Sequence, residues 1–221
     1  MATSTVEDYL KQIYHAQVDA PGALVPTGQV ATALEVAPGT ATAMVKTLAD
    51  SGLVEYEPYA GVRLTDAGEK LATHVLRRHR LVELFLVEVM GMDWSEVHGE
   101  AELLEHAVSN RLLERIDTML GQPAVDPHGD PIPSESGVVA AMNYPSLTTC
   151  AVGTSMTLVR VTDQATDFLR RIERCGLVPG VTVKVLTRDE QADMVEIRRL
   201  DGEPVSLGFR AASKIQVMPA A

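Results

Sequence analysis

The sequence predicts an α+β protein of several domains: an N-terminal winged helix-turn-helix, a helical middle region and a C-terminal small β-barrel. Apolar residues recur at helical spacing over roughly the first half of the chain, and short alternating segments replace them in the last third. The proline-rich segment QPAVDPHGDPIPSESG separates the two patterns. With 221 residues, 46% of them hydrophobic, the chain is long enough to bury a core in each part.

The first region carries the pattern of a winged helix. One helix is predicted over EDYLKQIYHAQV, and a short second helix over GQVATALEV with Thr27 as its N-cap. A turn at Pro38 and Gly39 leads into a third helix that ends at Gly52, and LVEYEPYAGVRLT alternates as a hairpin. Two helices joined by a short turn and followed by a hairpin are typical of proteins that read the major groove of DNA.

The outward face of the third predicted helix carries the residues expected to contact DNA. Its small polar side chains allow close approach to a groove, and its first backbone amides can meet a phosphate. The hairpin adds an aromatic ring and a cation. The predicted DNA-binding residues are Thr27, Pro38, Gly39, Thr40, Thr42, Ala43, Lys46, Thr47, Tyr59 and Arg63. For any one of the threonines, an ordinary exposed position is an equal alternative.

The middle region is predicted to be helical and the last region strand-rich. A long helix runs from Asp66 to Met90, and two shorter helices follow, capped by Ser95 and Ser109. Beyond the linker, MTLVRVT, VTVKVLTR, MVEIRRL and KIQVMP are predicted strands, with a helix before Gly176, which indicates a small barrel. The predicted domains are residues 1–73, 74–140 and 141–221.

The distribution of charge limits how the chain can bind nucleic acid. The net charge is −11, which excludes binding through a uniformly basic surface. Residues 1–73 carry four basic and nine acidic side chains (net −5), residues 74–140 five and twelve (−7), and residues 141–221 ten and nine (+1). Any DNA contact therefore requires locally placed cations. The acidic excess of the middle region is either a solvated surface or a site that collects cations.

Neither a secretory signal nor a membrane span is expected. Met1 is followed by the polar run ATSTVED, and the longest apolar stretches fall far short of the ~20 residues that a bilayer requires. Cys150 and Cys175 are the two cysteines, without metal-ligand spacing, and we interpret them as ordinary buried thiols. A reducing cytoplasmic location is the expectation.

A constellation of histidines and carboxylates predicts a metal centre in the middle region. One predicted helix carries four such residues at steps of four, three and one, which places them along one stripe. The preceding helix carries a histidine and a glutamate four residues apart. Two facing helices that each offer such a pair are the arrangement by which bundles hold divalent metals. The residues are His98, Glu102, Glu105 and His106 on one helix and His79 and Glu83 on the other.

The donor atoms of this constellation favour a hard cation. Carboxylate oxygen and imidazole nitrogen, with no thiolate, suit Mn(II) or Fe(II) and also accept Co(II), Ni(II) or Zn(II). A metal-dependent DNA-binding protein is therefore one hypothesis. A ferritin-like metal enzyme is a second, disfavoured because too few helices carry the required Glu-x-x-His motif. A winged-helix regulator that responds to a small organic ligand is a third.

The order of motifs resembles the metal-dependent repressors of the diphtheria toxin repressor family across essentially the whole chain. A winged helix is followed by RRHRLVE, VHGEAELLEHAVS and DPHGDPIP. The resemblance implies a helical dimerisation and metal-binding domain and a C-terminal SH3-like (FeoA-like) barrel. It further implies a cytoplasmic homodimer, without enzymatic activity, that binds a palindromic operator in double-stranded DNA when loaded with divalent metal and controls metal-homeostasis genes.

The resemblance also implies two sets of ligands. Asp8 and Glu102 match positions that are acidic in the manganese-sensing branch and sulfur-bearing in the iron-sensing branch, so Mn(II) is expected and an Fe(II)-responsive repressor is the alternative. Cd(II) is a further substitute ion. Lys11 departs from the two-domain manganese regulators, which puts a closely spaced pair of ions in doubt. The implied primary ligands are Asp8, Glu102, Glu105 and His106, and the implied ancillary ligands are His79, Glu83, His98 and, from the barrel, Asp163.

Overall fold

The computed structural model describes residues 3–200 and 202–220, which form two compact units. Unit 1 comprises Met1–His79, Glu105–Val108 and Pro133–Val139, and unit 2 comprises Arg80–Leu104, Ser109–Ile132 and Ala140–Ala221. Among the described helices, none combines the length and apolarity that crossing a bilayer demands. The predicted domain limits stay predictions, and the limit between residues 73 and 74 falls inside one continuous helix.

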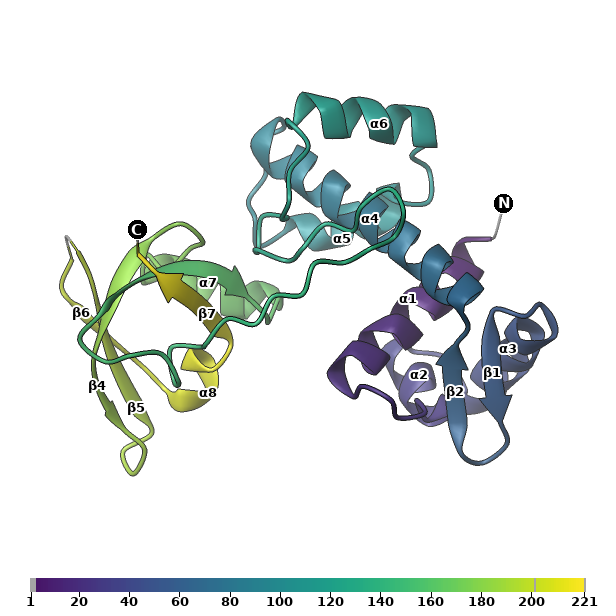
Figure 1. Cartoon of the computed structure of the whole chain (residues 1–221), viewed down its shortest axis with the longest axis horizontal. Coiled ribbons are helices and arrows are strands. Elements are labelled where there is room, and N and C mark those ends of the chain that lie inside the picture. The colour runs from purple at the N-terminus through teal and green to yellow at the C-terminus, as the bar shows by residue number, and fades with distance from the viewer. Residues whose placement is uncertain (1–2, 201, 221) are drawn as a thin grey trace. The chain divides into compact units, whose positions relative to one another are not determined.

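Unit 1 contains the winged helix that the sequence predicts (Figure 1). Its hairpin pairs antiparallel, with Val54 opposite Leu64, and Val25 forms a bridge to Val62 on the outer side of the hairpin. The predicted hairpin is therefore confirmed. The elements are α1 (Ser4–Asp19), α2 (Thr27–Ala33), α3 (Pro38–Asp50), β1 (Val54–Glu57) and β2 (Gly61–Leu64).

The core of the winged helix follows directly from the spacing of apolar residues. Leu10 and Ile13 on α1 are three residues apart and fully buried, as are Val45 and Leu48 on α3. Burying this side of α3 leaves its other side exposed, which is the side that carries the predicted DNA-contacting residues. Gly61 has a φ of 148°, and a Cβ there would lie 2.6 Å from the Val25 carbonyl oxygen, so this bridge requires glycine.

One predicted cap in this unit is wrong. Pro26 occupies the N-cap position of α2 in an extended conformation, and Thr27 is already the first helical residue. No side-chain hydrogen bond caps this helix. The physical reason is that an N-cap residue needs extended backbone angles, which the proline ring favours one residue earlier.

The helices of the middle region are α4 (Asp66–Glu88), α5 (Val97–Leu104) and α6 (Asn110–Met119). Ser109 caps α6 as predicted, because its side chain accepts a hydrogen bond from the Leu112 amide. Ser95 does not cap α5: its amide and hydroxyl both donate to Asp93, and the helix begins two residues later. The predicted single helical stripe is also wrong, because α5 ends at Leu104 and a turn follows.

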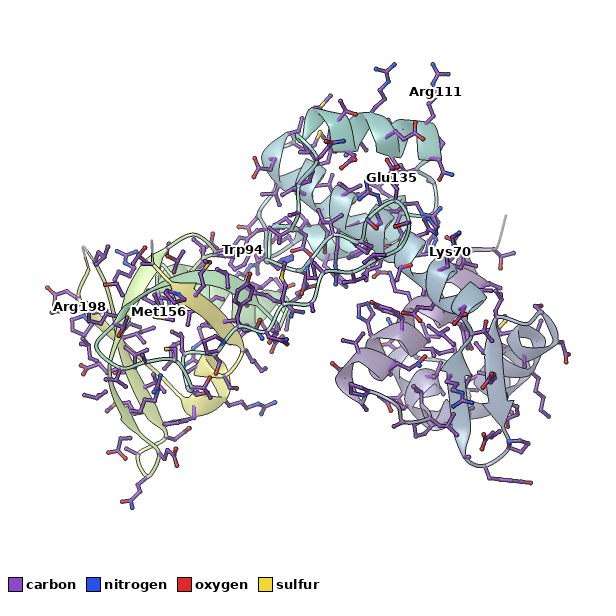
Figure 2. All side chains as sticks on the ribbon, viewed as in Figure 1. Lys70, Trp94, Arg111, Glu135, Met156 and Arg198 are labelled. Carbon is purple, nitrogen blue, oxygen red and sulfur yellow. The ribbon has the colours of Figure 1, made fainter. Side chains whose placement is uncertain are left out.

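The C-terminal part of unit 2 is a small antiparallel β-domain, as expected. Its five strands follow the order β6-β5-β4-β3-β7, and the sheet encloses a core to which Trp94, labelled in Figure 2, also contributes. The sequence did not predict β6 and α8. The elements are β3 (Ser155–Val161), α7 (Thr166–Arg174), β4 (Thr182–Asp189), β5 (Met194–Arg199), β6 (Pro204–Leu207), α8 (Phe209–Ala212) and β7 (Ile215–Pro219).

Candidate metal centres

The first centre lies in unit 1, where α1 meets the turn Glu105–Val108. His106 Nε2 lies 2.9 Å from Asp8 Oδ1 and 3.4 Å from Glu105 Oε1. Neighbouring ligands of a cation bound at ~2.1 Å are about 3 Å apart, so these three atoms fit one divalent ion. Three of the four predicted primary ligands are therefore brought together by the fold.

The second ring nitrogen of His106, Nδ1, is held by a carboxylate. His106 Nδ1 lies 2.7 Å from Glu7 Oε2, and Arg78 donates to the other Glu7 oxygen at 2.7 Å. A histidine that binds a metal usually donates its second ring N–H to such a partner, which fixes the tautomer and the ring orientation. The sequence analysis did not identify Glu7 and Arg78, although Glu7 directly precedes the predicted ligand Asp8.

Glu105 is fully buried between two cationic or hydrogen-bonding partners. Lys11 Nζ lies 2.7 Å from its Oε1, and His79 Nδ1 lies 2.6 Å from its Oε2. Burial by itself raises the pKa of Glu105, but the hydrogen bonds from His79 and Lys11 and their charges outweigh burial and hold the pKa below its usual value. The Glu105 carboxylate is thus held in its ionised form, which is the form that can bind a cation. Asp8 differs, because burial raises its pKa despite the opposing effect of His106.

Two further predicted ligands, Glu102 and His98, belong to unit 2. His98 Nε2 lies 3.6 Å from Glu102 Oε1, one helical turn away on α5. His98 Nδ1 lies 3.2 Å from Glu83 Oε1 on α4. Within unit 2 the fold therefore brings His98 together with Glu83 and Glu102, whereas the described contact of His79 is with Glu105 in unit 1.

A second cluster lies in the interior of unit 2. Glu83, Asp126 and His128 are 0%, 4% and 0% exposed, and each offers one donor atom within 4.8 Å of the others. Asp126 Oδ2 and His128 Nδ1 are buried and make no hydrogen bond. His128 Nε2 lies 2.9 Å from the Trp94 carbonyl oxygen, so the remaining ring nitrogen is the one available to a cation.

The charges around this cluster explain why a cation fits. Burial raises the pKa of Asp126 well above its usual value, and the negative charges of Asp130 and Glu83 raise it further, whereas Arg80 partly opposes them. A buried carboxylate with one oxygen that accepts no hydrogen bond is costly unless a proton or a cation neutralises it. Oxygen and imidazole donors are those that hard divalent ions accept. The sequence analysis assigned Asp126 and His128 to a linker and so did not identify this cluster; its signal was the Asp-x-His spacing in DPHGD.

Asp163, the ligand predicted from the barrel, is engaged elsewhere. Its Oδ1 accepts a hydrogen bond from the Ala165 amide at 3.0 Å, and its Oδ2 pairs with Lys214. Burial raises its pKa, but the hydrogen bonds from Lys214 and Ala165 prevail and lower it. These contacts hold the backbone just before α7, although the N-cap position of this helix is occupied by Ala165. Its role as a ligand stays a prediction.

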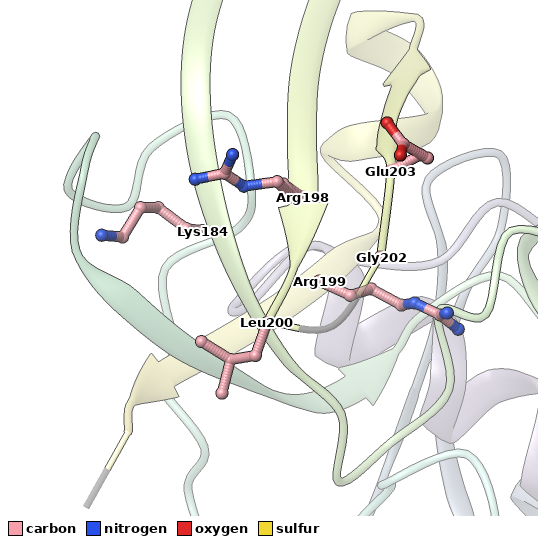
Figure 3. A pocket seen from close by; sticks show the side chains of 6 residues that line it. All are labelled: Lys184, Arg198, Arg199, Leu200, Gly202 and Glu203. Atoms are coloured by element: carbon pink, nitrogen blue, oxygen red, sulfur yellow. The ribbon is translucent and has the colours of Figure 1, made fainter.

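A pocket on the β-domain has the opposite charge and does not suit a cation. An open pocket of about 380 Å³ is lined by three cationic side chains, Lys184, Arg198 and Arg199, and by the acidic Glu203. Figure 3 shows Lys184 and Arg198 on neighbouring strands, with the Arg199 side chain pointing to the other side. Lys184 and Arg198 are directly opposite each other in the β4–β5 ladder. Like charges at opposed positions repel each other, so this surface favours anions.

Protein-family models match all three parts of the chain. A model described as the N-terminal DNA binding domain of iron dependent repressors matches residues 1–62, and one described as their metal binding and dimerisation domain matches residues 65–134. A FeoA domain model matches residues 146–219. The iron-dependent repressor IdeR of Mycobacterium tuberculosis (strain ATCC 25618 / H37Rv) is 32% identical over 195 residues, which cover 83% of this chain and 84% of that protein.

The chain belongs to the iron-dependent repressor family. The diphtheria toxin repressor of Corynebacterium diphtheriae is 32% identical over 171 residues, covering 76% of this chain and 70% of that protein. A solved structure of a manganese-dependent transcriptional repressor in complex with manganese superposes with a TM-score of 0.88 at 41% identity, covering 97% of this chain and all of that one. The resemblance is thus confirmed: this repressor binds DNA and divalent metal.

Most, but not all, of the residues predicted to contact DNA in this iron-dependent repressor family member are exposed. Lys46 and Thr47 on α3 are exposed, whereas Thr42 is half-buried and its hydroxyl donates to the Pro38 carbonyl oxygen at 2.9 Å. At the tip of the wing Tyr59 is fully exposed with a φ of 67°. Arg63 pairs with Glu55 across the hairpin at 2.5 Å, so part of its charge is neutralised. Which of the predicted residues touch DNA stays a prediction.

Proposed function

We propose that this chain is a manganese-responsive repressor that acts as a homodimer on a palindromic operator of metal-homeostasis genes. The observation that carries the proposal is the position of His106 Nε2 between Asp8 Oδ1 and Glu105 Oε1. Glu102, from the same sequence motif, is the fourth proposed ligand. These four donors are three carboxylates and one imidazole, a hard set that lacks the sulfur favoured by softer ions. Fe(II) is the alternative physiological ion, and Co(II), Ni(II), Zn(II) and Cd(II) are substitutes.

A second cation is proposed to bind in the interior of unit 2. Glu83, Asp126 and His128 supply the donors, and the buried Asp126 Oδ2 and His128 Nδ1, which make no hydrogen bond, support this assignment. Glu83 is shared with the ligand set predicted from the sequence, in which His79, His98 and Asp163 complete an ancillary site. The contact of His98 with Glu83 keeps that histidine close enough to participate.

The proposed regulation acts through the position of α1. Bound divalent metal supplies positive charge among carboxylates that otherwise repel one another. Asp8 lies on α1 of the winged helix, and Glu105 and His106 come from the turn after α5. When Asp8, Glu105 and His106 share a cation, α1 is tied to this turn, which restricts the orientation of the DNA-binding domain. In a dimer this favours two recognition helices at the ~34 Å separation of successive major grooves.

The proposed dimer surface is the exposed apolar side of the unit 2 helices. Leu103 is 74% exposed, Met119 65% and Met90 63%, and Val89, Leu104 and Leu112 are exposed as well. Large apolar side chains left exposed in such number on one domain are candidates for an interface with another protein. The family's dimerisation domain covers these helices, so a second copy is the proposed partner.

The proposal is tested by measuring operator binding while the metal is varied. A footprint on genomic DNA should appear with Mn(II) and vanish after chelation. Asp8→Met and Glu102→Cys, separately and together, should move the preference from Mn(II) towards softer ions, because sulfur replaces oxygen. DNA affinity that chelation leaves unchanged would contradict metal sensing. An unchanged order of activating metals in the double variant would contradict the assignment of Asp8 and Glu102 as the selective ligands.

A further inference from the structure

The loop of residues 126–130 carries two of the three donors of the buried cluster and is folded tightly on itself. Asp126 Oδ1 accepts hydrogen bonds from the amides of His128, at 2.8 Å, and Asp130, at 2.9 Å. Asp126 Oδ2 is buried and makes no hydrogen bond, and its ionic partner is Arg80 Nε at 3.7 Å. The shape of the loop therefore determines where both donors, Asp126 Oδ2 and His128 Nδ1, lie.

The same loop lies directly against strand β3 of the C-terminal β-domain. The Val161 amide donates to the His128 carbonyl oxygen at 2.8 Å. Gly129 has a φ of 89°, and a Cβ at this position would clash with the Val159 carbonyl oxygen. The backbone of the loop therefore contacts the backbone of β3 directly, with no side chain between them. A shift of β3 consequently moves His128, which bears the imidazole donor.

A side-chain clamp reinforces this backbone contact. Asp130, which is 6% exposed, receives hydrogen bonds on both carboxylate oxygens. Arg160 Nε donates to Oδ1 at 2.5 Å, and Gln164 Nε2 donates to Oδ2 at 2.7 Å. Both donors come from the β-domain, 30 and 34 residues away in sequence. We call Asp130, Arg160 and Gln164 the Asp130 clamp.

We propose that the C-terminal β-domain, through the Asp130 clamp, positions the donors of the buried cation centre, so that cation binding and docking of the β-domain stabilise each other. The inference rests on the proposed role of Glu83, Asp126 and His128 as a cation site. The clamp residues are positioning residues and do not touch the ion. Because coupling between two equilibria is reciprocal, the factor by which docking strengthens cation binding equals the factor by which the cation strengthens docking, so a change that disrupts docking also weakens cation binding.

The first experiment measures Mn(II) affinity at the buried centre alone. In the full chain, His106→Ala removes the first centre, and Mn(II) binding is followed by loss of the free-ion EPR signal. Adding Arg160→Met should weaken binding about 10- to 100-fold, the usual effect of losing a group that orients metal ligands. Arg160→Lys should recover part of this loss. The matched control is Arg170→Met, which removes an exposed ion pair with Glu96 elsewhere in unit 2 and should leave affinity unchanged.

The second experiment leaves the clamp intact and reads docking directly. In the His106→Ala chain, Mn(II) should slow hydrogen exchange of the Val161 amide, and adding Asp126→Asn should abolish that protection. If the His106→Ala chain binds no Mn(II), or if Asp126→Asn does not reduce binding, the proposed cation site is wrong and the inference falls with it. If Mn(II) binds there but Arg160→Met matches Arg170→Met and Val161 exchange is unaffected by the ion, the inference alone is wrong.

Discussion

At the scale of single residues, the proposed ligands of the first centre are held by side chains that are not themselves proposed to bind the ion. Glu7 orients His106, and Arg78 in turn holds Glu7. Lys11 and His79 hold the two carboxylate oxygens of Glu105 in the same way. The orientation of His106 and of Glu105 is therefore fixed before a cation binds, which lowers the cost of ordering these two proposed ligands.

Replacing Glu7 by glutamine should weaken Mn(II) binding at the first centre by about 10- to 100-fold, because the His106 ring loses its anionic partner. Isothermal titration calorimetry on the metal-free chain measures the change. Glu57→Gln, at an exposed position of the wing, is the matched control and should bind as the original chain does. Equal affinities for the two variants would show that Glu7 does not orient the ligand.

The raised pKa of Asp126 predicts a specific pH dependence in the chelated protein. Because the pKa in the folded state lies above the unfolded value, Asp126 contributes stability that is fully present below the unfolded pKa and is lost as pH rises through the folded pKa. Thermal unfolding of the metal-free chain should reveal this loss, and Asp126→Asn should remove it. Saturating Mn(II) should also suppress the loss, because the cation favours the ionised carboxylate. A pH profile that is identical in the Asp126→Asn variant would contradict this account.

At the scale of elements, close packing at the start of α4 joins this helix to the wing. A Cβ on Gly68 would collide with the backbone carbonyl of Leu53, which precedes β1. The Thr65 amide also donates to that carbonyl oxygen at 3.1 Å. The junction therefore leaves no space for a larger residue.

Gly68→Ala should destabilise the protein by about 1–3 kcal/mol, the usual cost of overpacking a well-packed site. Gly28→Ala is the matched control: this glycine is also helical, and a Cβ there meets no atom within 4 Å. That change should stabilise by roughly 0.5–1 kcal/mol through the unfolded state. Denaturant unfolding with Mn(II) present compares the two, and equal effects would show that the junction can relax.

Helix α3 makes a separate prediction about DNA. If Lys46 neutralises a phosphate, Lys46→Ala should weaken binding to all sequences alike and reduce the slope of log affinity against log salt by about 1 per subunit. Lys70→Ala, an exposed lysine on α4, is the control and should not alter the slope. Fluorescence anisotropy at several salt concentrations measures both slopes. An unchanged slope for Lys46→Ala would place this residue off the DNA.

At the scale of the whole molecule, the excess of acidic residues determines how strongly bound cations change the net charge. The chain has a net charge of −11, and the proposed ligands include several of its thirty acidic residues. Each divalent ion adds two positive charges, so loading both proposed centres changes the net charge of a subunit from −11 to about −7 before protons are counted. Metal binding therefore also relieves electrostatic repulsion between the repressor and DNA.

The exposed apolar residues of unit 2 predict how the chain assembles. Leu103→Glu should shift sedimentation equilibrium from dimer towards monomer, because a charge cannot be buried in an apolar interface without a partner. Leu200→Glu is the control, since Leu200 is 72% exposed on the β-domain, against 74% for Leu103. Dimers of undiminished stability in the Leu103 variant would place the interface elsewhere.

The local elements could be predicted from the sequence because their causes are local. The helix over EDYLKQIYHAQV, the Ser109 cap and the alternating hairpin are set by neighbouring residues, and each prediction is confirmed. The donor atoms of the predicted metal ligands also follow from the sequence, because they depend on residue type alone. The single helical stripe was wrong because periodicity alone cannot show that α5 ends at Leu104 and that Glu105 and His106 turn towards α1.

The amino-acid sequence thus determined the family, the three kinds of domain and a hard, oxygen-rich set of ligands. Only the tertiary structure decided that Glu7 orients His106, that Lys11 neutralises Glu105, and that a linker supplies Asp126 and His128 to a buried cluster. The first two of these contacts join residues 99 and 94 positions apart, and no local pattern encodes them. Their physical cause is burial, which forces distant charged groups to find partners inside the fold.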